Sequence, residues 1–128
     1  SRPCLKKDFV QADATHLPFK PQSFDTVVLG DILEHVENPV KVLNQAGIVS
    51  RRRIVLTVPK DERLPEGQHI KKARELDKDR ICPTINFFSE SWLRSLVILM
   101  RWMNYRVILW QFVPAQAWMN WLIVLERM

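Results

Sequence analysis

Two short apolar runs rich in β-branched residues dominate the first half of the chain. Residues 24–29 (Phe-Asp-Thr-Val-Val-Leu) and residues 53–58 (Arg-Ile-Val-Leu-Thr-Val) have the length and composition of buried strands. Between them, Asn38-Pro39 is a strong helix start, because asparagine caps free amides and proline is tolerated at the first helical position. Apolar residues then continue at helical spacing to about Ile48. This order predicts a right-handed unit of strand, helix and strand, with the two strands parallel.

The segments on either side of this unit are more polar. Phe9 to Ala12 is a short apolar segment that we expect to form a strand ending near Asp13, where turn-forming residues follow. Residues 60–80 are highly charged, which predicts a long exposed loop with one helical turn around residues 71–76. Loops of this length often act as functional lids.

A helix and two strands are predicted for the last third of the chain. Ser89 is a helix cap, and apolar residues recur three and four positions apart as far as Met103, which predicts a helix that packs on the sheet. Residues 106–113 and 118–126 are apolar runs joined by a four-residue connection, which is short enough for an antiparallel hairpin. The whole pattern predicts an α/β fold: parallel strands of a partial Rossmann-like sheet that closes on a C-terminal antiparallel hairpin.

Composition limits the class of protein without selecting a function. With 128 residues and 47% hydrophobic content, residues 1–128 are expected to form a single domain with a real core. The net charge of +5 suits an anionic substrate, a nucleic acid or an acidic membrane surface. Cys4 and Cys82 lack the spacing of a metal site or of a secreted disulfide framework, so we predict no metal and a cytoplasmic location. No signal peptide is visible, and the missing initiator Met hints at a piece of a longer protein.

Ionisable side chains gather directly after the first predicted strand of the parallel unit. Gly30-Asp31 ends that strand, and Glu34 and His35 follow within one turn. In open α/β sheets, ligands lie outside the carboxyl ends of parallel strands. The sequence therefore predicts the floor and rim of a cofactor pocket at this point.

Residues 12–19, 23–29 and 33–39 form three motifs that resemble those of the class I S-adenosylmethionine-dependent methyltransferases, in the group called the type 11 methyltransferase domain. Residues 12–19 (Ala-Asp-Ala-Thr-His-Leu-Pro-Phe) resemble the segment that follows the family's third strand, and residues 23–29 resemble its fourth strand. Residues 33–39 (Leu-Glu-His-Val-Glu-Asn-Pro) resemble the turn after that strand, and residues 54–59 its fifth strand with the usual proline. The resemblance implies that the chain corresponds to the C-terminal two-thirds of the family's fold.

The resemblance also implies roles for five residues in binding S-adenosylmethionine. Asp13 is expected to accept from the adenine amine and Ala14 to offer its backbone amide to a ring nitrogen, although Asp13 also suits a turn cap. Gly30 is expected to let the backbone approach the methionine moiety, or to be a simple turn glycine. Asp31 belongs to the same expected cofactor site, and Leu33 packs against the cofactor or the helix behind it.

The catalytic role is left open between two readings. His35 could act as a general base for an oxygen or nitrogen nucleophile, with Glu34 beside it. Alternatively, these two side chains tie down the loop, and methyl transfer depends on in-line positioning alone. The acceptor is expected to be a small molecule or a lipid-like compound.

The sequence departs from the family where the cofactor's tail is held. The family's Gly-rich loop and the acidic residue ending its second strand are absent, and no glycine lies in a GxGxxG setting. The family's missing first strand would belong between the strands at Phe9 and Phe24. A fragment of a longer chain, a non-catalytic relative and a half supplied by a partner all remain as explanations.

The C-terminal tryptophans and the arginine triplet are expected to have structural or solvent-exposed roles and no role in chemistry. The five tryptophans are expected to pack in the core, and peripheral membrane contact remains an alternative. Arg101 and Arg106 interrupt the apolar run, so no segment is expected to span a bilayer. Residues 51–53 (Arg-Arg-Arg) are expected to be a solvated strand end, and nucleic acid is not the favoured partner. A homo-oligomer remains open. The alternative function is a non-catalytic, basic, methyltransferase-like interaction module that uses the charged loop at residues 60–80.

Overall fold

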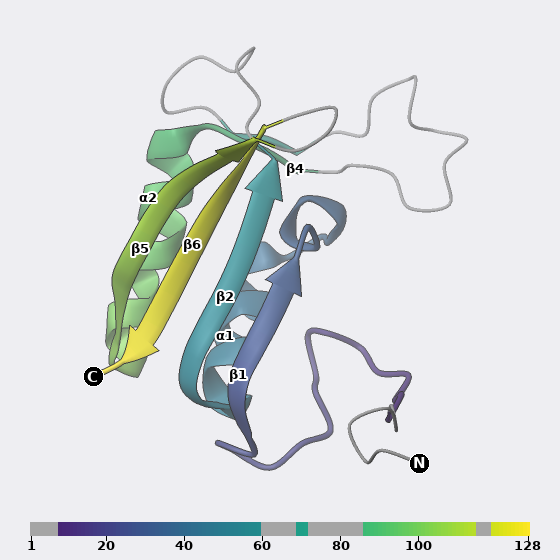
Figure 1. Cartoon of the computed structure of the whole chain (residues 1–128). Coiled ribbons are helices and arrows are strands. Elements are labelled where there is room, and N and C mark those ends of the chain that lie inside the picture. Colours follow the sequence, from purple (N-terminus) through teal and green to yellow (C-terminus); the bar gives the residue numbers. More distant parts are fainter. Residues whose placement is uncertain (1–7, 60–68, 72–85, 115–118) are drawn as a thin grey trace, which may run out of the picture.

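A four-stranded mixed sheet organises the chain (Figure 1), whose computed structural model describes residues 8–59, 69–71, 86–114 and 119–128. The strand order is β1-β2-β6-β5. Strands β1 (Phe24–Gly30) and β2 (Ser50–Pro59) are parallel, whereas β6 (Met119–Arg127) is antiparallel to both β2 and β5 (Tyr105–Pro114). The predicted α/β fold, with a parallel unit and a closing antiparallel hairpin, is confirmed.

Both predicted helices form, and each begins with a side-chain cap. In α1 (Pro39–Val49), Oδ1 of Asn38 accepts a hydrogen bond from the amide of Lys41 at 3.1 Å. In α2 (Glu90–Ile98), Oγ of Ser89 accepts from the amide of Trp92 at 3.2 Å. The last turn of the predicted C-terminal helix is instead a 3₁₀ segment, η4 (Leu99–Met103). No helix in the described part of the chain is long and apolar enough to cross a membrane.

The two helices lie on the same face of the sheet (Figure 1). Alternate residues of the strands point toward them and form the core together with the buried residues of the helices. The fully buried aliphatic positions of the two central strands are Ile54, Leu56, Val58, Ile123 and Leu125. Because this covered face supplies most of the buried apolar area, it provides most of the hydrophobic stabilisation.

The opposite face of the sheet has no helix over it in the described part of the chain (Figure 1). The strand register places four aliphatic residues in one row across this open face: Val28, Val55, Val124 and Leu109. These side chains are half-buried or exposed, and Val28 on the edge strand is 67% exposed. The open face therefore carries an apolar row that the described residues leave accessible.

A small two-stranded antiparallel ribbon lies outside the main sheet. It consists of β3 (His69–Lys71) and β4 (Asn86–Phe88). Most of the predicted loop at residues 60–80 lies outside the described residues, as do residues 72–76 of the predicted helical turn, Cys4 and Cys82. The first residue of that turn, Lys71, ends a strand.

The strand expected at Phe9 to Ala12 is wrong. Residues 8–12 are irregular and exposed, with Phe9 86% exposed. The described residues provide no neighbouring strand for this segment, and a strand needs a paired neighbour for its backbone groups. Apolar composition alone did not make a strand here.

Core packing of the tryptophans is only partly confirmed. Trp121 is buried, and Trp92 and Trp110 pack against the core while partly buried. Trp102 is 89% exposed, so the core reading is wrong for that residue. Trp118 lies outside the described residues.

Candidate functional site

The candidate site lies at the carboxyl end of β1, where the chain leaves the sheet for a short 3₁₀ turn, η2 (Leu33–His35). The carboxyl end of parallel strand β2 lies beside it, because Gly30 pairs with Thr57. Open α/β sheets place their ligand sites at this edge.

Asp31 is at the centre of a polar cluster that joins three strands. Its backbone has a φ of 50°, a left-handed conformation that aspartate tolerates better than most residues. Its amide donates to the Thr57 hydroxyl oxygen at 3.0 Å, and that hydroxyl donates to Oδ1 of Asp31 at 3.0 Å. Nδ2 of Asn120, on β6, donates to Oδ1 of Asp31 at 3.3 Å. These bonds fix the turn after β1 against its neighbours.

Glu34 is an acidic side chain buried next to this turn. It is only 2% exposed, and neither carboxyl oxygen has a hydrogen-bond partner among the described residues. Burial, together with the charge of Asp31, raises the pKa of Glu34 to about 8. At neutral pH the group is therefore mainly a neutral acid that can donate a proton. Nε2 of His35 lies 3.8 Å from Oε1 of Glu34, so the two predicted catalytic candidates are neighbours.

Leu33 and Gly30 differ in what surrounds them. Leu33 is completely buried in the core, so its packing against the body of the fold is observed, and contact with a cofactor stays a prediction. Gly30 is exposed, and a Cβ added to it would meet nothing within 4 Å. Space for a ligand is therefore open beside its backbone.

Asp13 lies in a turn and not at the end of a strand. Its Oδ1 accepts from the amide of Thr15 at 2.8 Å and from the Thr15 hydroxyl at 2.6 Å, and these bonds hold the pKa of Asp13 below its usual value. The turn-capping role considered for Asp13 is thus present. A role in adenine binding stays a prediction.

The segment that carries Asp13 packs along α1. The amide of Leu17 donates to the side chain of Gln45 at 2.9 Å, and Nε2 of His16 lies 3.2 Å from Nζ of Lys41. These contacts place the turn over the first half of the helix, which begins near the carboxyl end of β1.

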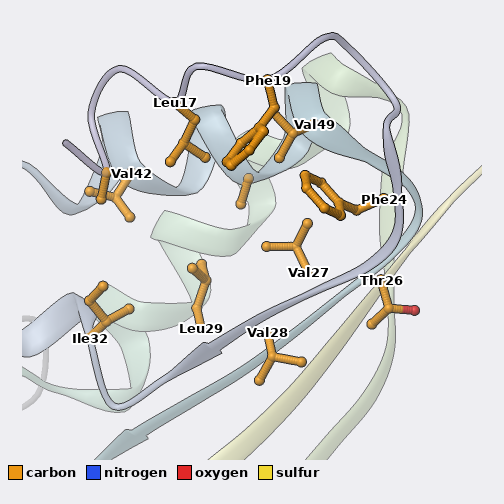
Figure 2. Close-up of a pocket in the computed structure, with 12 residues that line it drawn as sticks. Leu17, Phe19, Phe24, Thr26, Val27, Val28, Leu29, Ile32, Val42 and Val49 are labelled. Carbon is orange, nitrogen blue, oxygen red and sulfur yellow. The ribbon is translucent and has the colours of Figure 1, made fainter. Parts of the chain in front are cut away.

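An apolar groove of about 330 Å³ runs between this segment, β1 and α1. Figure 2 shows side chains from all three parts pointing into it, with Leu17 and Phe19 on one side and Val27 and Leu29 on the other. Ala14 lines the same groove as Leu29 and Ile32, the residues that flank the turn at Gly30 and Asp31. The groove therefore brings Ala14 and the turn after β1 to one surface. Its volume lies within the range of small-molecule sites.

Sequence reasoning missed two residues of the polar cluster, Thr57 and Asn120. Thr57 could have been found, because a small polar residue near the carboxyl end of a parallel strand is well placed for a ligand site. Asn120 carries no local signal. It contacts Asp31 across 89 positions of sequence, a pairing that only the register of β6 creates.

The chain resembles known methyltransferases in sequence and fold. Residues 2–52 match the family model described as "Methyltransferase domain". No curated protein sequence matches the chain. Among solved structures, a 1,6-didemethyltoxoflavin-N1-methyltransferase from Burkholderia thailandensis, with bound 1,6-didemethyltoxoflavin and S-adenosylhomocysteine, has a TM-score of 0.69 at 17% identity. That match covers 94% of this chain and 50% of the other.

Two further structures support the same fold. A S-adenosylmethionine-dependent methyltransferase from Methanosarcina mazei has a TM-score of 0.66 at 14% identity, covering 91% of this chain and 65% of the other. The magnesium protoporphyrin IX methyltransferase from Synechocystis PCC 6803, with bound S-adenosylmethionine, has a TM-score of 0.60 at 15% identity, covering 94% and 45%. The chain thus spans roughly half to two-thirds of the length of these structures.

The fold defines a Rossmann-like α/β domain with its candidate site at the carboxyl ends of the parallel strands. Together with the match of residues 2–52 to the methyltransferase family model, this fold makes the chain similar to class I methyltransferase domains, the type that the sequence motifs resemble.

Proposed function

We propose that this domain takes part in methyl transfer from S-adenosylmethionine to a small-molecule or lipid-like acceptor. The observation that carries the proposal is the apolar groove along β1, in a fold like that of methyltransferases, where Ala14 shares one lining with Leu29 and Ile32, the residues that flank the turn after β1. The location in the cytoplasm, the single-domain organisation and a homo-oligomer remain predictions.

The residues present suit one part of the cofactor. An apolar groove lined by a small residue fits a flat heterocycle such as adenine, and Ala14 has better support than Asp13, because Ala14 lines the groove and Asp13 does not. Gly30 and Asp31 would lie along the adjoining part of the cofactor, where the backbone of Gly30 is open to approach. The sequence holds no Gly-rich loop for the methionine carboxylate, so we propose that groups outside these 128 residues complete the site.

When bound, S-adenosylmethionine would supply an activated methyl group, which a lone pair of the acceptor would take as the methyl–sulfur bond breaks with its electrons left on sulfur. The acceptor then loses a proton. Glu34 is a poor base for that proton at neutral pH, because burial already keeps it protonated. We therefore assign the general-base role, where the acceptor needs one, to His35. Glu34 lies beside it, with Oε1 3.8 Å from Nε2 of His35.

Titration calorimetry with S-adenosylhomocysteine tests the proposal. We expect the chain to bind it with sub-millimolar affinity, more weakly than a complete site would, because the groups that hold the methionine carboxylate lie outside these residues. Gly30→Val should weaken binding at least tenfold without lowering the melting temperature, because the added side chain meets open space in the protein. As a matched control, Gly47→Ala should leave the affinity unchanged while altering stability, since its Cβ would lie 2.7 Å from Cε of Met100 in the core. Absence of binding at millimolar ligand would contradict the proposal for this chain.

The second candidate function is a non-catalytic interaction module. It is favoured by the arginines Arg51, Arg52 and Arg53, which are all exposed at the end of the sheet opposite the candidate site. A module of this kind would bind a partner with equal affinity in the presence and absence of S-adenosylhomocysteine, and it would not bind the cofactor analogue itself.

A further inference from the structure

Six arginines gather at the end of the domain opposite the candidate site. The amino end of β2, the carboxyl end of β6, the start of β5 and the segment η4 meet there because β5 and β6 form an antiparallel hairpin (Figure 1). We name this surface the basic end and define it by its arginines: Arg51, Arg52, Arg53, Arg101, Arg106 and Arg127.

The acidic side chains at this surface are fewer than the basic ones. Asp25 pairs with Arg51, and Glu126 pairs with Arg53 at 3.2 Å and with Arg106 at 3.5 Å. Arg52 and Arg101 have no ion pair with any described residue and are exposed. Two carboxylates therefore face six guanidinium groups, and the surface keeps a positive potential that attracts anions.

A polar hollow of about 370 Å³ lies within the basic end, lined by the arginine triplet together with Glu126, Arg127 and Met128. Its base is rigid. Nη2 of Arg127 donates to the carbonyls of Gly47 and Ser50, both at 2.8 Å, and its guanidinium stacks on the Tyr105 ring at 4.7 Å. Arg127 is thus committed to the fold, and the arginines around the rim are those available to a partner.

Exposed apolar side chains flank the basic end on the outer side of the helix layer. Trp102 is 89% exposed, Ile98 is 55% exposed and Leu99 is 45% exposed. Trp102 directly follows Arg101 in sequence. Two residues further on, the carbonyl of Asn104 accepts a hydrogen bond from the amide of Met128 at 2.6 Å, which joins this segment to the hollow that Met128 lines. Exposed tryptophan and aliphatic residues beside arginines are the composition of a surface that inserts into a lipid interface.

We infer that the basic end, with Ile98, Leu99 and Trp102, docks the domain on an anionic phospholipid surface. The arginines contact the headgroup phosphates, and the three apolar side chains enter the boundary between headgroups and acyl chains. Charge complementarity and the aliphatic residues decide the partner, because a nucleic acid would use the arginines and the indole ring but would give Ile98 and Leu99 little to contact. Docked in this way, the candidate site at the other end of the sheet faces the water.

Vesicle sedimentation of the full chain tests this inference without any cofactor. We expect binding to vesicles of phosphatidylcholine and phosphatidylglycerol at 3:1, no binding to phosphatidylcholine alone, and loss of binding in about 0.5 M salt, where charges are screened over a few ångströms. Trp102→Ala should weaken the partition coefficient about tenfold. The double variant Arg52→Ala/Arg101→Ala should weaken it about 25-fold, roughly fivefold for each arginine.

A matched control distinguishes docking through the basic end from nonspecific hydrophobic binding. Val28→Ser removes an exposed apolar side chain of similar accessibility from the β1 edge, and it should leave vesicle binding unchanged. All variants should keep the wild-type circular dichroism spectrum, because every altered side chain is exposed. Wild-type binding that is equal on neutral vesicles, that survives Trp102→Ala or the double arginine substitution, or that falls with Val28→Ser would overturn the inference. So would tighter binding of an RNA oligonucleotide that is insensitive to Trp102→Ala.

Discussion

The two faces of the central sheet are built from the same strands but end in different environments. Toward the helices, Ile54, Leu56 and Ile123 have no exposed surface. On the other side, the row of Val28, Val55, Val124 and Leu109 crosses all four strands with no described helix over it. Successive side chains of a strand point to opposite faces, so the continuous apolar runs make both faces apolar, but within the described residues only one face has a partner layer.

The two faces differ in whether the described residues cover them. The covered face packs on α1 and α2, and its buried apolar cluster within the described residues comes from both helices and from β1, β2, β5 and β6. The open face has the composition of a surface that another layer covers, and the solved structures that match this chain are longer than it. Rossmann-like sheets normally carry helices on both faces.

Two valines on β2 provide the most direct test of this difference between the two faces. Val58 points to the covered face with no exposed surface, and Val55 points to the open face, half-buried. We expect Val58→Ala to lower the free energy of unfolding by about 2–3 kcal/mol, and Val55→Ala by less than about 1 kcal/mol. Urea denaturation measures both. Equal losses would mean that residues outside the described part of the chain cover the open face.

The covered interior also contains an acid. Glu34 is buried next to Leu33 and has no hydrogen-bond partner among the described residues. Its folded-state pKa of about 8 lies above the ordinary value of 4.5, so the folded protein holds the proton more tightly than the unfolded chain. The stability from this group is fully present at low pH and is lost as pH rises from about 4.5 to 8. The slope within that window should approach about 1.4 kcal/mol per pH unit.

The matched variant for this prediction is Glu34→Gln, which keeps the shape of the side chain and cannot titrate. We expect its stability, followed by denaturation between pH 5 and pH 8, to lose most of the slope seen for the wild type. The same slope in both proteins would show that Glu34 is ionised and solvated at neutral pH.

Local signals in the sequence were sufficient for most of the fold. Asn38 with Pro39, and Ser89, mark the starts of both helices because a cap satisfies free amides within the same turn. The segment from Phe9 to Ala12 failed because a strand depends on a neighbour that the local sequence does not reveal. Trp102 was misplaced because the core expectation treated the five tryptophans as a group, whereas Trp102 lies three and four residues after the exposed Leu99 and Ile98 and shares their side of the segment.

The candidate site was less predictable than the fold. Gly30, Asp31, Glu34 and His35 lie within six consecutive residues, and their position at and after the end of a strand indicated the edge of the sheet where they lie. The burial of Glu34 and the contact between Asp31 and Asn120 depend on packing between distant parts of the chain. No spacing of residues could have revealed either feature.

The smallest expected effect concerns the edge of the open face. Among the strands that the structure describes, β1 pairs only with β2, and Val28 projects from it with 67% of its surface exposed. An edge strand with exposed apolar residues can pair with another chain, and a lysine there opposes such pairing. We expect Val28→Lys to change the unfolding free energy by no more than about 0.5 kcal/mol, while reducing concentration-dependent association in sedimentation velocity.

Val124→Lys is the control: in the middle of the row it should destabilise the fold by more than Val28→Lys, because β2 and β5 flank it on both sides. Association of the wild type that persists unchanged in Val28→Lys would place the self-contact elsewhere on the molecule and leave the β1 edge without a role in it.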